Sequence, residues 1–343
     1  MPTVTLQPSG HVFQVEEGEA VLTAALRQGY ILPYGCKDGA CGTCKGKIIS
    51  GSVDYGTYQE KALPAEERAA GKALFCQAKP LGDLVIEART VGAAKDIPIK
   101  TLPCRVQKID RVTEDVAILF LKPPANERLQ FLAGQYIEFL LKDRTRRSFS
   151  MANAPHDDEL VQLHVRHVPG GNFTDHVFTK MKERDILRFE GPHGTFFLRE
   201  DSQNPIVFVA SGTGFAPIKS IIEYALNKNI ARPMTLYWGG RRPRDLYLNA
   251  LPLKWAAEHA GFKYVPVVSE ALPEDRWTGR TGFVHRAVME DLPDLSGCQV
   301  YACGVPIMVD SARRDFISQC KLPEDEFFAD SFTTQADIAP SPK

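Results

Sequence analysis

Four cysteines near the start of the chain have a spacing that suits iron–sulfur chemistry. Cys36, Cys41 and Cys44 follow the pattern C-x4-C-x2-C, and Cys76 lies thirty-two positions after Cys44. Thiolate ligands of a plant-type [2Fe–2S] cluster have this spacing. Zinc is the alternative, but zinc sites usually contain two short C-x2-C pairs, and only Cys41 and Cys44 form one here. We therefore predict that these four cysteines are the metal ligands.

Several residues in and beside this cysteine segment are small, as a loop around a cluster requires. They are Gly35, Gly39, Ala40 and Gly42. Small residues let a loop wrap tightly and point its amide N–H groups at the sulfur atoms. Of the remaining four cysteines, we expect Cys104, Cys298 and Cys320 to be apolar packing residues rather than ligands.

A glycine-containing loop in the second half of the chain is suited to a diphosphate. The apolar run 206–210 leads into Ser-Gly-Thr-Gly-Phe-Ala-Pro at 211–217. Glycines allow the backbone to approach the anion, and Pro217 fits the first turn of a helix whose N-terminus attracts it. Pro217 replaces the third glycine of the usual G-x-G-x-x-G pattern. An ordinary strand–helix turn is the competing interpretation.

The bulk composition describes a globular protein of more than one domain. The chain has 343 residues, of which 44% are hydrophobic and 24% are charged, and its net charge is −1. This balance gives no reason to expect binding to nucleic acid or to an anionic membrane. We see no signal peptide, and no run approaches the roughly 20 apolar residues of a membrane span. We expect a cytoplasmic protein without membrane insertion.

The cysteines fall within a small first domain, for which we predict residues 1–92. Strands at 4–6 and 11–15 form a hairpin, and a short helix follows at 20–28. Later strands are expected at 47–49 and 84–88. Glycine, alanine and proline then indicate a linker at 93–100.

Two further domains follow. Residues 101–200 contain alternating runs at 104–109, 116–121, 136–141 and 160–167, which favour a small antiparallel barrel. Residues 204–335 contain short apolar runs at 206–210, 234–238, 264–268 and 299–302, with helical stretches between them. Apolar strands that alternate with helices indicate a parallel sheet covered on both faces.

With these motifs in place, the chain resembles a known family over nearly its whole length. Residues 1–92 resemble a plant-type ferredoxin, and the remainder resembles the ferredoxin–NADP reductase superfamily through Arg-Ser-Phe-Ser at 147–150 and Gly-Thr-Gly-Phe-Ala-Pro at 212–217. The ferredoxin-first order is that of reductases serving bacterial oxygenases or CDP-6-deoxy-3,4-glucoseen biosynthesis. The resemblance implies a β-grasp [2Fe–2S] domain, a Greek-key β-barrel FAD domain and a Rossmann-like nicotinamide domain.

The resemblance also implies roles in flavin binding, with FAD favoured over FMN. An arginine fork suits the flavin diphosphate, and an aromatic ring suits the isoalloxazine. Ser150 is expected to hydrogen-bond flavin N5, and the loop at 170–174 to hold the pyrophosphate at the start of a helix over 174–181. The implied flavin-binding residues are Arg147, Ser148, Phe149, Ser150, Gly170, Gly171, Asn172 and Thr174.

On the nicotinamide side, the resemblance places Cys303 near nicotinamide C4 and flavin N5. There its thiol orients the ring and is not a covalent nucleophile; a buried packing cysteine is the alternative. Phe332 is expected to shield the flavin, with Phe328 or simple core packing as competitors. The implied catalytic residues are Ser150, Cys303 and Phe332, and those of the nicotinamide site are Gly212, Thr213, Gly214, Pro217, Arg241, Cys303, Gly304 and Pro306.

The choice between NADH and NADPH depends on residues after the run 234–238. Three arginines, at 241, 242 and 244, suit a 2′-phosphate, whereas Asp245 suits the ribose hydroxyls of NADH. The resemblance favours NADH and leaves NADPH possible.

Together these features imply an NAD(P)H-dependent iron–sulfur flavoprotein oxidoreductase. Electrons would pass from NADH to FAD, to [2Fe–2S], and then to a partner protein. The two cofactors are needed because a nicotinamide moves two electrons and the cluster accepts one. The partner would be a sugar-nucleotide dehydrase or an oxygenase component. A stand-alone diaphorase or flavin reductase with a small-molecule acceptor is the alternative, and a redox-sensing binding module is the non-enzymatic one.

Overall fold

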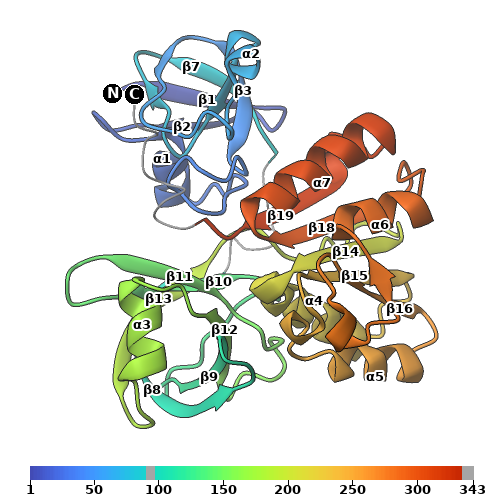
Figure 1. The fold of residues 1–343 in the computed structure, drawn as a ribbon. Helices are drawn as coiled ribbons and strands as arrows, with labels where there is room; N and C mark the ends of the chain where they lie inside the picture. Colours follow the sequence, from blue (N-terminus) through green and yellow to red (C-terminus); the bar gives the residue numbers. More distant parts are fainter. Residues whose placement is uncertain (90–96, 334–343) are drawn as a thin grey trace. The chain divides into compact units, whose positions relative to one another are not determined.

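The computed structural model describes residues 1–89 and 97–333, which form two compact units. The first unit contains the described residues up to Pro98 together with 331–333, and the second contains Ile99–Asp330 (Figure 1). Residues 93–96 of the expected linker at 93–100 lie outside the described residues, and its last residue, Lys100, begins strand β8 (Lys100–Arg111). The domain boundaries remain predictions.

The first unit is built on a five-stranded sheet in the order β2-β1-β7-β3-β5. Strand β1 pairs antiparallel with β2, which confirms the predicted hairpin, and pairs parallel with β7. This mixed order, with helix α1, is that of a β-grasp fold. The elements are β1 (Thr3–Gln7), β2 (His11–Gln14), α1 (Val21–Arg27), β3 (Lys45–Ser50), β4 (Val53–Asp54), α2 (Ala65–Ala69), β5 (Lys72–Leu74), β6 (Lys79–Pro80) and β7 (Leu84–Glu87).

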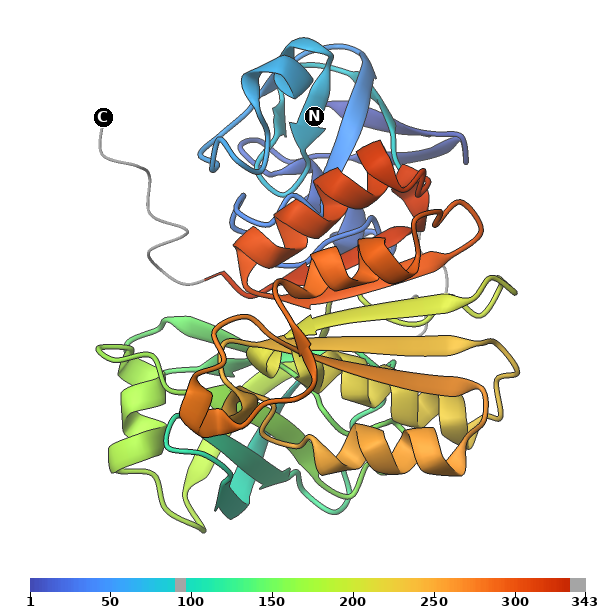
Figure 2. The ribbon, with the colours of Figure 1, turned by 45° about the vertical axis from the view of Figure 1, so that its right-hand side comes forward.

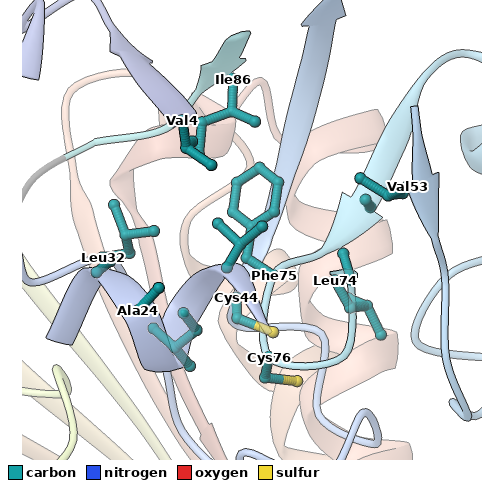
Figure 3. Packing of buried hydrophobic residues seen from close by; sticks show 14 of the residues in the cluster. Val4, Ala24, Leu32, Cys44, Val53, Leu74, Phe75, Cys76 and Ile86 are labelled. Carbon is teal, nitrogen blue, oxygen red and sulfur yellow. The ribbon is translucent and has the colours of Figure 1, made fainter. Parts of the chain in front are cut away.

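Alternating residues of these strands form the core of the first unit. Val4 and Leu6 on β1 and Ile86 on β7 are fully buried, because every second side chain of a strand points to the same face. Helix α1 contributes Ala24 from the opposite side (Figure 3). Cys44 belongs to the same cluster of buried residues. The core therefore holds one end of the cysteine loop in place.

The second unit begins with six strands in the order β11-β10-β13-β8-β9-β12. All pairings given for this sheet are antiparallel, and neighbours in space are often not neighbours in sequence, as in a Greek key. Within the described residues, the edge strands β11 and β12 do not pair as a continuous ladder, so the expected barrel is not fully closed. Met151, next to β11, forms an isolated bridge with Leu163 of β12. The elements are β8 (Lys100–Arg111), β9 (Val116–Lys122), β10 (Tyr136–Leu140), β11 (Arg146–Ser150), β12 (Val161–Arg166), α3 (Asn172–Thr179) and β13 (Ile186–His193).

Aromatic side chains fill the space between this sheet and α3. Phe139 of β10 stacks on Phe173 of α3, with ring centroids 4.7 Å apart, and Phe149 of β11 lies 5.1 Å from the same ring. Phe189 of β13 is fully buried in the same cluster. Helix α3 is thereby fixed beside the strand that carries Arg147–Ser150 (Figure 1).

The rest of the second unit is a six-stranded sheet in the order β17-β16-β15-β14-β18-β19. The pairings of β14 through β18 that the structure defines are parallel, as predicted. Helices α4 and α5 cover one face, and α6 and α7 cover the other (Figure 2). The elements are β14 (Ile206–Ser211), α4 (Phe215–Asn227), β15 (Met234–Gly240), α5 (Ala250–Glu258), β16 (Phe262–Val268), β17 (Arg280–Thr281), α6 (Val284–Asp291), β18 (Gln299–Gly304), α7 (Pro306–Gln319) and β19 (Phe327–Ser331).

This topology gathers the predicted nicotinamide residues at one edge. Strand β15 follows β14 in the sequence and pairs with one of its edges, whereas β18 pairs with the other edge. The direction in which successive strands are added therefore changes between β14 and β18. Ligands of open parallel sheets bind at such a point, beyond the carboxyl ends of the strands. The loops after β14, β15 and β18 meet there. Among the described helices, none combines the length and the apolar character that crossing a membrane demands.

Candidate redox site

The four predicted cluster cysteines are brought together in two pairs. The thiols of Cys36 and Cys41 hydrogen-bond each other, as do those of Cys44 and Cys76. Figure 3 shows the sulfur atoms of Cys44 and Cys76 close together at the edge of the core. Two pairs of thiols suit a centre with two irons, each of which takes two protein sulfurs. The residues therefore fit a [2Fe–2S] cluster better than a single tetrahedral zinc ion.

Backbone amides of the loop point at the sulfurs, as the small residues led us to expect. The amide of Cys36 donates to Cys41 Sγ at 3.4 Å, and that of Asp38 donates to Cys36 Sγ at 3.4 Å. The hydrogen bond with the Cys36 thiol is the largest cause that lowers the pKa of Cys41 to about 6; burial acts against it, and the Cys36 amide makes a smaller contribution. Metal binding requires deprotonated thiols, so donors to sulfur favour the ligand form.

Gly39 is required by the shape of this loop. Its φ is +74°, and a Cβ there would lie 2.9 Å from the backbone oxygen of Thr57 and 3.0 Å from Cβ of Tyr58. A side chain at this position would therefore be strained and would also collide with the neighbouring segment. Gly42, at φ +75°, shares the conformational requirement but not the crowding.

The Arg-Ser-Phe-Ser motif forms edge strand β11, paired with β10. Arg147 and Phe149 lie on one face of the strand, and Ser148 and Ser150 lie on the other, because strand side chains alternate. Phe149 is partly buried against Phe173, whereas Ser148 is exposed and Ser150 is buried. Arg147 keeps most of its donors available, since its one hydrogen bond defined here is to the carbonyl of Arg146.

The second part of the expected flavin site lies beside this strand, but its threonine is used differently. Asn172 donates to Asp143, whose carboxylate also interacts electrostatically with Arg147. The hydroxyl of Thr174 donates to the carbonyl of Val168 at 2.9 Å. It therefore shapes the loop of Gly170 and Gly171, and the roles of Thr174 and of the loop amides at the pyrophosphate remain predictions.

Ser150, Cys303 and a residue that we did not predict, Asp330, lie together in the second unit. Ser150 Oγ is 3.3 Å from Asp330 Oδ2. Cys303 is fully buried at the end of β18; burial, with a smaller contribution from Asp330, raises its pKa well above the ordinary value. The thiol is thus neutral near pH 7, which agrees with an orienting role and not with a covalent nucleophile.

The loop that follows β14 lies directly against the end of β18. A Cβ on Gly214 would lie 2.2 Å from the carbonyl oxygen of Cys303, and one on Gly304 would lie 2.1 Å from Ser211 Oγ. The amide of Val305 donates to that Ser211 oxygen at 3.1 Å. The two expected nicotinamide segments therefore form one interlocked structure that tolerates only glycine at both crossing points.

The other predicted residues of this site surround the crossing. Gly212 has φ +51°, and its carbonyl accepts a hydrogen bond from Trp238 at 3.0 Å. Gly212, Thr213 and Gly214 form a short 3-10 turn before α4, with Pro217 in the first turn of that helix. Pro306 is the first residue of α7. Thr213 and Pro306 therefore border the same edge.

Arg166 is a second residue of the site that the sequence did not reveal. It comes from β12 of the strand-rich domain, yet its guanidinium would lie 3.3 Å from a Cβ on Gly212. It forms ion pairs with Asp115 at 3.3 Å and Asp245 at 3.8 Å. Its Nε and Nη2 atoms are buried and make no hydrogen bond within the described residues. A diphosphate on the glycine loop would supply acceptors for them.

One further group resembles a metal site but is already neutralised. Potential ligand atoms of Glu138, Glu190 and His193 lie within 4.8 Å of one another. Arg146 pairs with both carboxylates, at 2.9 Å and 2.7 Å. His193 ends strand β13 and is buried. We interpret this group as an ion-pair network of the sheet.

The two aromatic candidates for shielding the flavin differ in their surroundings. Phe328 of β19 stacks on Tyr301, with centroids 4.8 Å apart, and also contacts the guanidinium of Arg199. Its ring is therefore engaged in packing the sheet. Phe332 directly follows β19, and its assignment as the shielding ring remains a prediction.

Comparison with family models gives the same three parts in the same order. Residues 4–81 match the 2Fe-2S iron-sulfur cluster binding domain. Residues 103–198 match the oxidoreductase FAD-binding domain, and residues 208–314 match the oxidoreductase NAD-binding domain. The cofactors of the chain are accordingly a [2Fe–2S] cluster, FAD and NAD(H).

Similarity to characterised proteins extends over nearly the whole chain. It is 44% identical to the CDP-6-deoxy-L-threo-D-glycero-4-hexulose-3-dehydrase reductase of Yersinia pseudotuberculosis, covering 96% of this chain and 98% of the relative. It is 38% identical to the reductase component of phenol 2-monooxygenase from a Pseudomonas species, covering 98% of this chain and 96% of the relative. The chain belongs to the ferredoxin-fused reductases of the ferredoxin–NADP reductase superfamily. It is thus an NAD(P)H-dependent iron–sulfur flavoprotein oxidoreductase that passes electrons to a partner.

A solved structure supports the same membership for this ferredoxin-fused reductase. The crystal structure of the Amycolatopsis cytochrome P450 reductase is 35% identical, with a TM-score of 0.77, and the match covers 97% of this chain and 99% of that one.

Proposed function

We propose that this ferredoxin-fused reductase takes hydride from NADH at the edge formed by β14 and β18 and delivers single electrons through Cys36, Cys41, Cys44 and Cys76 to a protein partner. Bound FAD would convert one two-electron transfer into two one-electron transfers, which is why both redox centres are needed. The observation that carries the proposal is the convergence of Ser150, Cys303 and Asp330 beside the glycine loop.

Several residues of the chain would bind NADH, the hydride donor. Gly212 and Gly214 would let the backbone approach the nicotinamide diphosphate, and Arg166, which pairs with Asp115 and Asp245, would bring its guanidinium beside it. Cys303, neutral and fully buried, would border the nicotinamide ring. These groups position the ring, and positioning alone contributes a large part of the rate in such transfers.

Ser150 and Asp330 would provide a path for the proton of flavin N5. Ser150 Oγ would hydrogen-bond N5, and at 3.3 Å it can donate its own proton to Asp330. The carboxylate would hold that proton when the flavin is reoxidised. Arg147 would hold the flavin diphosphate, and Phe149 would pack against the ring system.

The partner that we favour is a sugar-nucleotide dehydrase. The 44% identical relative is named as the reductase of such a dehydrase, whereas the oxygenase reductase described above is 38% identical. We further propose that the protein works in the cytoplasm, where thiol ligands remain reduced. Coupled turnover would decide the partner: NADH oxidation that depends on the hexulose dehydrase supports this choice, and dependence only on an oxygenase component contradicts it.

The route through the cluster is tested with one ligand variant and a matched control. Cys76→Ser should abolish NADH-dependent reduction of cytochrome c while NADH still bleaches the bound flavin. Cys104→Ser, a change at a buried cysteine outside the cluster, should retain both activities. Full reduction of cytochrome c by Cys76→Ser would favour a stand-alone diaphorase instead. Bleaching that is retained in both variants shows that both are folded.

A further inference from the structure

The loop after β15 lies where a dinucleotide-binding sheet reads the adenosine ribose. In such folds the residues beyond the second strand contact the ribose hydroxyl of NAD or the 2′-phosphate of NADP. Here that strand is β15, which ends at Gly240 and is followed by Arg241 and Arg242. The side chains around these residues therefore set the choice between the two coenzymes.

Asp245, which would be the obvious ribose ligand, is engaged with its own loop. One oxygen, Oδ2, accepts the amide N–H groups of Arg241 at 2.9 Å and Arg242 at 3.0 Å. The other, Oδ1, lies 3.8 Å from the guanidinium of Arg166. Gly240 is needed for this turn, because a Cβ there would lie 2.7 Å from that of Asp245. Asp245 shapes the loop, so selection must come from another group.

Arg242 is held by two carboxylates from the turn after β16. Its Nε donates to Asp275 Oδ2 at 2.7 Å, and its Nη2 donates to Asp275 Oδ1 at 2.8 Å. Glu274 lies 3.5 Å from the same Nη2. The amide of Leu272 also donates to Asp275, at 2.9 Å, which fixes the carboxylate in place. Such a two-point pair is among the strongest that arginine forms.

The charge balance of this group is unfavourable for a phosphate. The hydrogen bond with Arg242 lowers the pKa of Asp275 to about 2, so this carboxylate is ionised at any working pH. Arg242 is matched by two acidic side chains, of which Asp275 is partly buried and Glu274 is exposed. Arg241 and Arg244 are exposed to water; Arg244 also acts electrostatically on Asp275, but exposed cations bind weakly because water screens them.

We propose that Asp275, together with Glu274, makes this reductase select NADH over NADPH by holding Arg242 in an ion pair. A 2′-phosphate would meet an arginine whose Nε and Nη2 donors are already used and two carboxylates that repel it, whereas the 2′-hydroxyl of NADH carries no charge. This inference rests on the proposed function, and it assigns coenzyme selectivity to residues of the turn Pro273–Asp275 and not to Asp245.

The test is the double variant Glu274→Gln, Asp275→Asn in the whole protein. Freeing one arginine for a phosphate corresponds to about a tenfold rise in the ratio of kcat/KM for NADPH to that for NADH. Glu290→Gln, which removes a carboxylate partner of Arg280 elsewhere in the same domain, should leave the ratio unchanged. Adding Arg242→Gln to the double variant should remove the gain.

Binding of coenzyme fragments gives a measurement that is independent of turnover. Calorimetry should show that the double variant binds 2′,5′-ADP about tenfold more tightly than the wild type, with 5′-AMP affinity unchanged. An unchanged preference for NADH and unchanged 2′,5′-ADP affinity in a variant that still turns over NADH would overturn the inference. If neither coenzyme bleaches the flavin of the wild-type protein, it is the proposed function that fails. Should the double variant not fold, Asp275→Asn alone carries the same comparison.

Discussion

Replacing Gly214 by alanine tests how the nicotinamide edge is built. The added Cβ would lie 2.2 Å from the carbonyl oxygen of Cys303, 2.4 Å from its carbonyl carbon and 2.6 Å from Cα of Gly304. All three atoms belong to backbone, so no rotamer change relieves the overlap. The two segments must separate by about 1 Å to reach an ordinary contact distance.

This displacement should affect catalysis more than folding. Overpacking of this kind costs about 1–3 kcal/mol of stability. A misplacement of about 1 Å near the reacting atoms lowers kcat/KM by about 100-fold. We therefore expect flavin reduction by NADH, followed by stopped-flow absorbance, to slow by one to two orders of magnitude in Gly214→Ala, while the reduced cluster signal obtained with dithionite is retained.

A glycine in an open position provides the control. Gly261 has no atom within 4 Å of an added Cβ, so Gly261→Ala should reduce flavin at the wild-type rate. If Gly214→Ala also reduced flavin within about twofold of the wild-type rate, the close crossing of the loop and β18 would not position the nicotinamide. The assignment of this edge would then be wrong.

Further predictions concern single residues of the site. Arg147→Ala should lose bound FAD, measured as flavin released on heating, and full retention would remove Arg147 from the diphosphate site. Cys303→Ala should slow hydride transfer and leave the cluster spectrum intact, whereas unchanged kinetics would make Cys303 a packing residue. Burial lowers the pKa of His164 well below 6.5, so below that pH the unfolded chain binds a proton that the folded chain does not. Stability should therefore be complete above pH 6.5 and fall by up to about 1.4 kcal/mol per pH unit below it. His164→Gln should flatten the melting temperature between pH 7.5 and 5.5, and an equal slope in both proteins would show that His164 is not the group responsible.

Strongly patterned elements could be predicted from the sequence. The apolar runs of β14, β15, β16 and β18 and the hairpin of β1 and β2 were found because their burial requires apolar or alternating residues. Strands β11 and β13 were missed as strands, since their arginines, serines and glutamate hide the alternation. The cysteine ligands could be predicted because metal coordination fixes both residue type and spacing.

Residues that act across elements could not be predicted. Asp330 is a single carboxylate near the end of the chain, and only the pairing of β19 in the sheet brings it to Ser150. Arg166 has no motif of its own, and it becomes a candidate ligand because the guanidinium reaches Gly212 from a different domain. Asp275 is a third residue of this kind, since nothing in its local sequence indicates an ion pair with Arg242. Such contacts depend on tertiary packing and carry no local signal.

In this protein, we infer, one polypeptide accepts a two-electron donor and releases single electrons through its cysteine-bound cluster. The most direct test of this electron path is electron paramagnetic resonance of the reconstituted protein, frozen anaerobically after mixing with NADH. We predict bleaching of the flavin together with the signal of a reduced [2Fe–2S] cluster, and loss of that signal alone in Cys76→Ser. A protein that dithionite reduces to give the cluster signal, but in which NADH reduces only the flavin, would contradict the account.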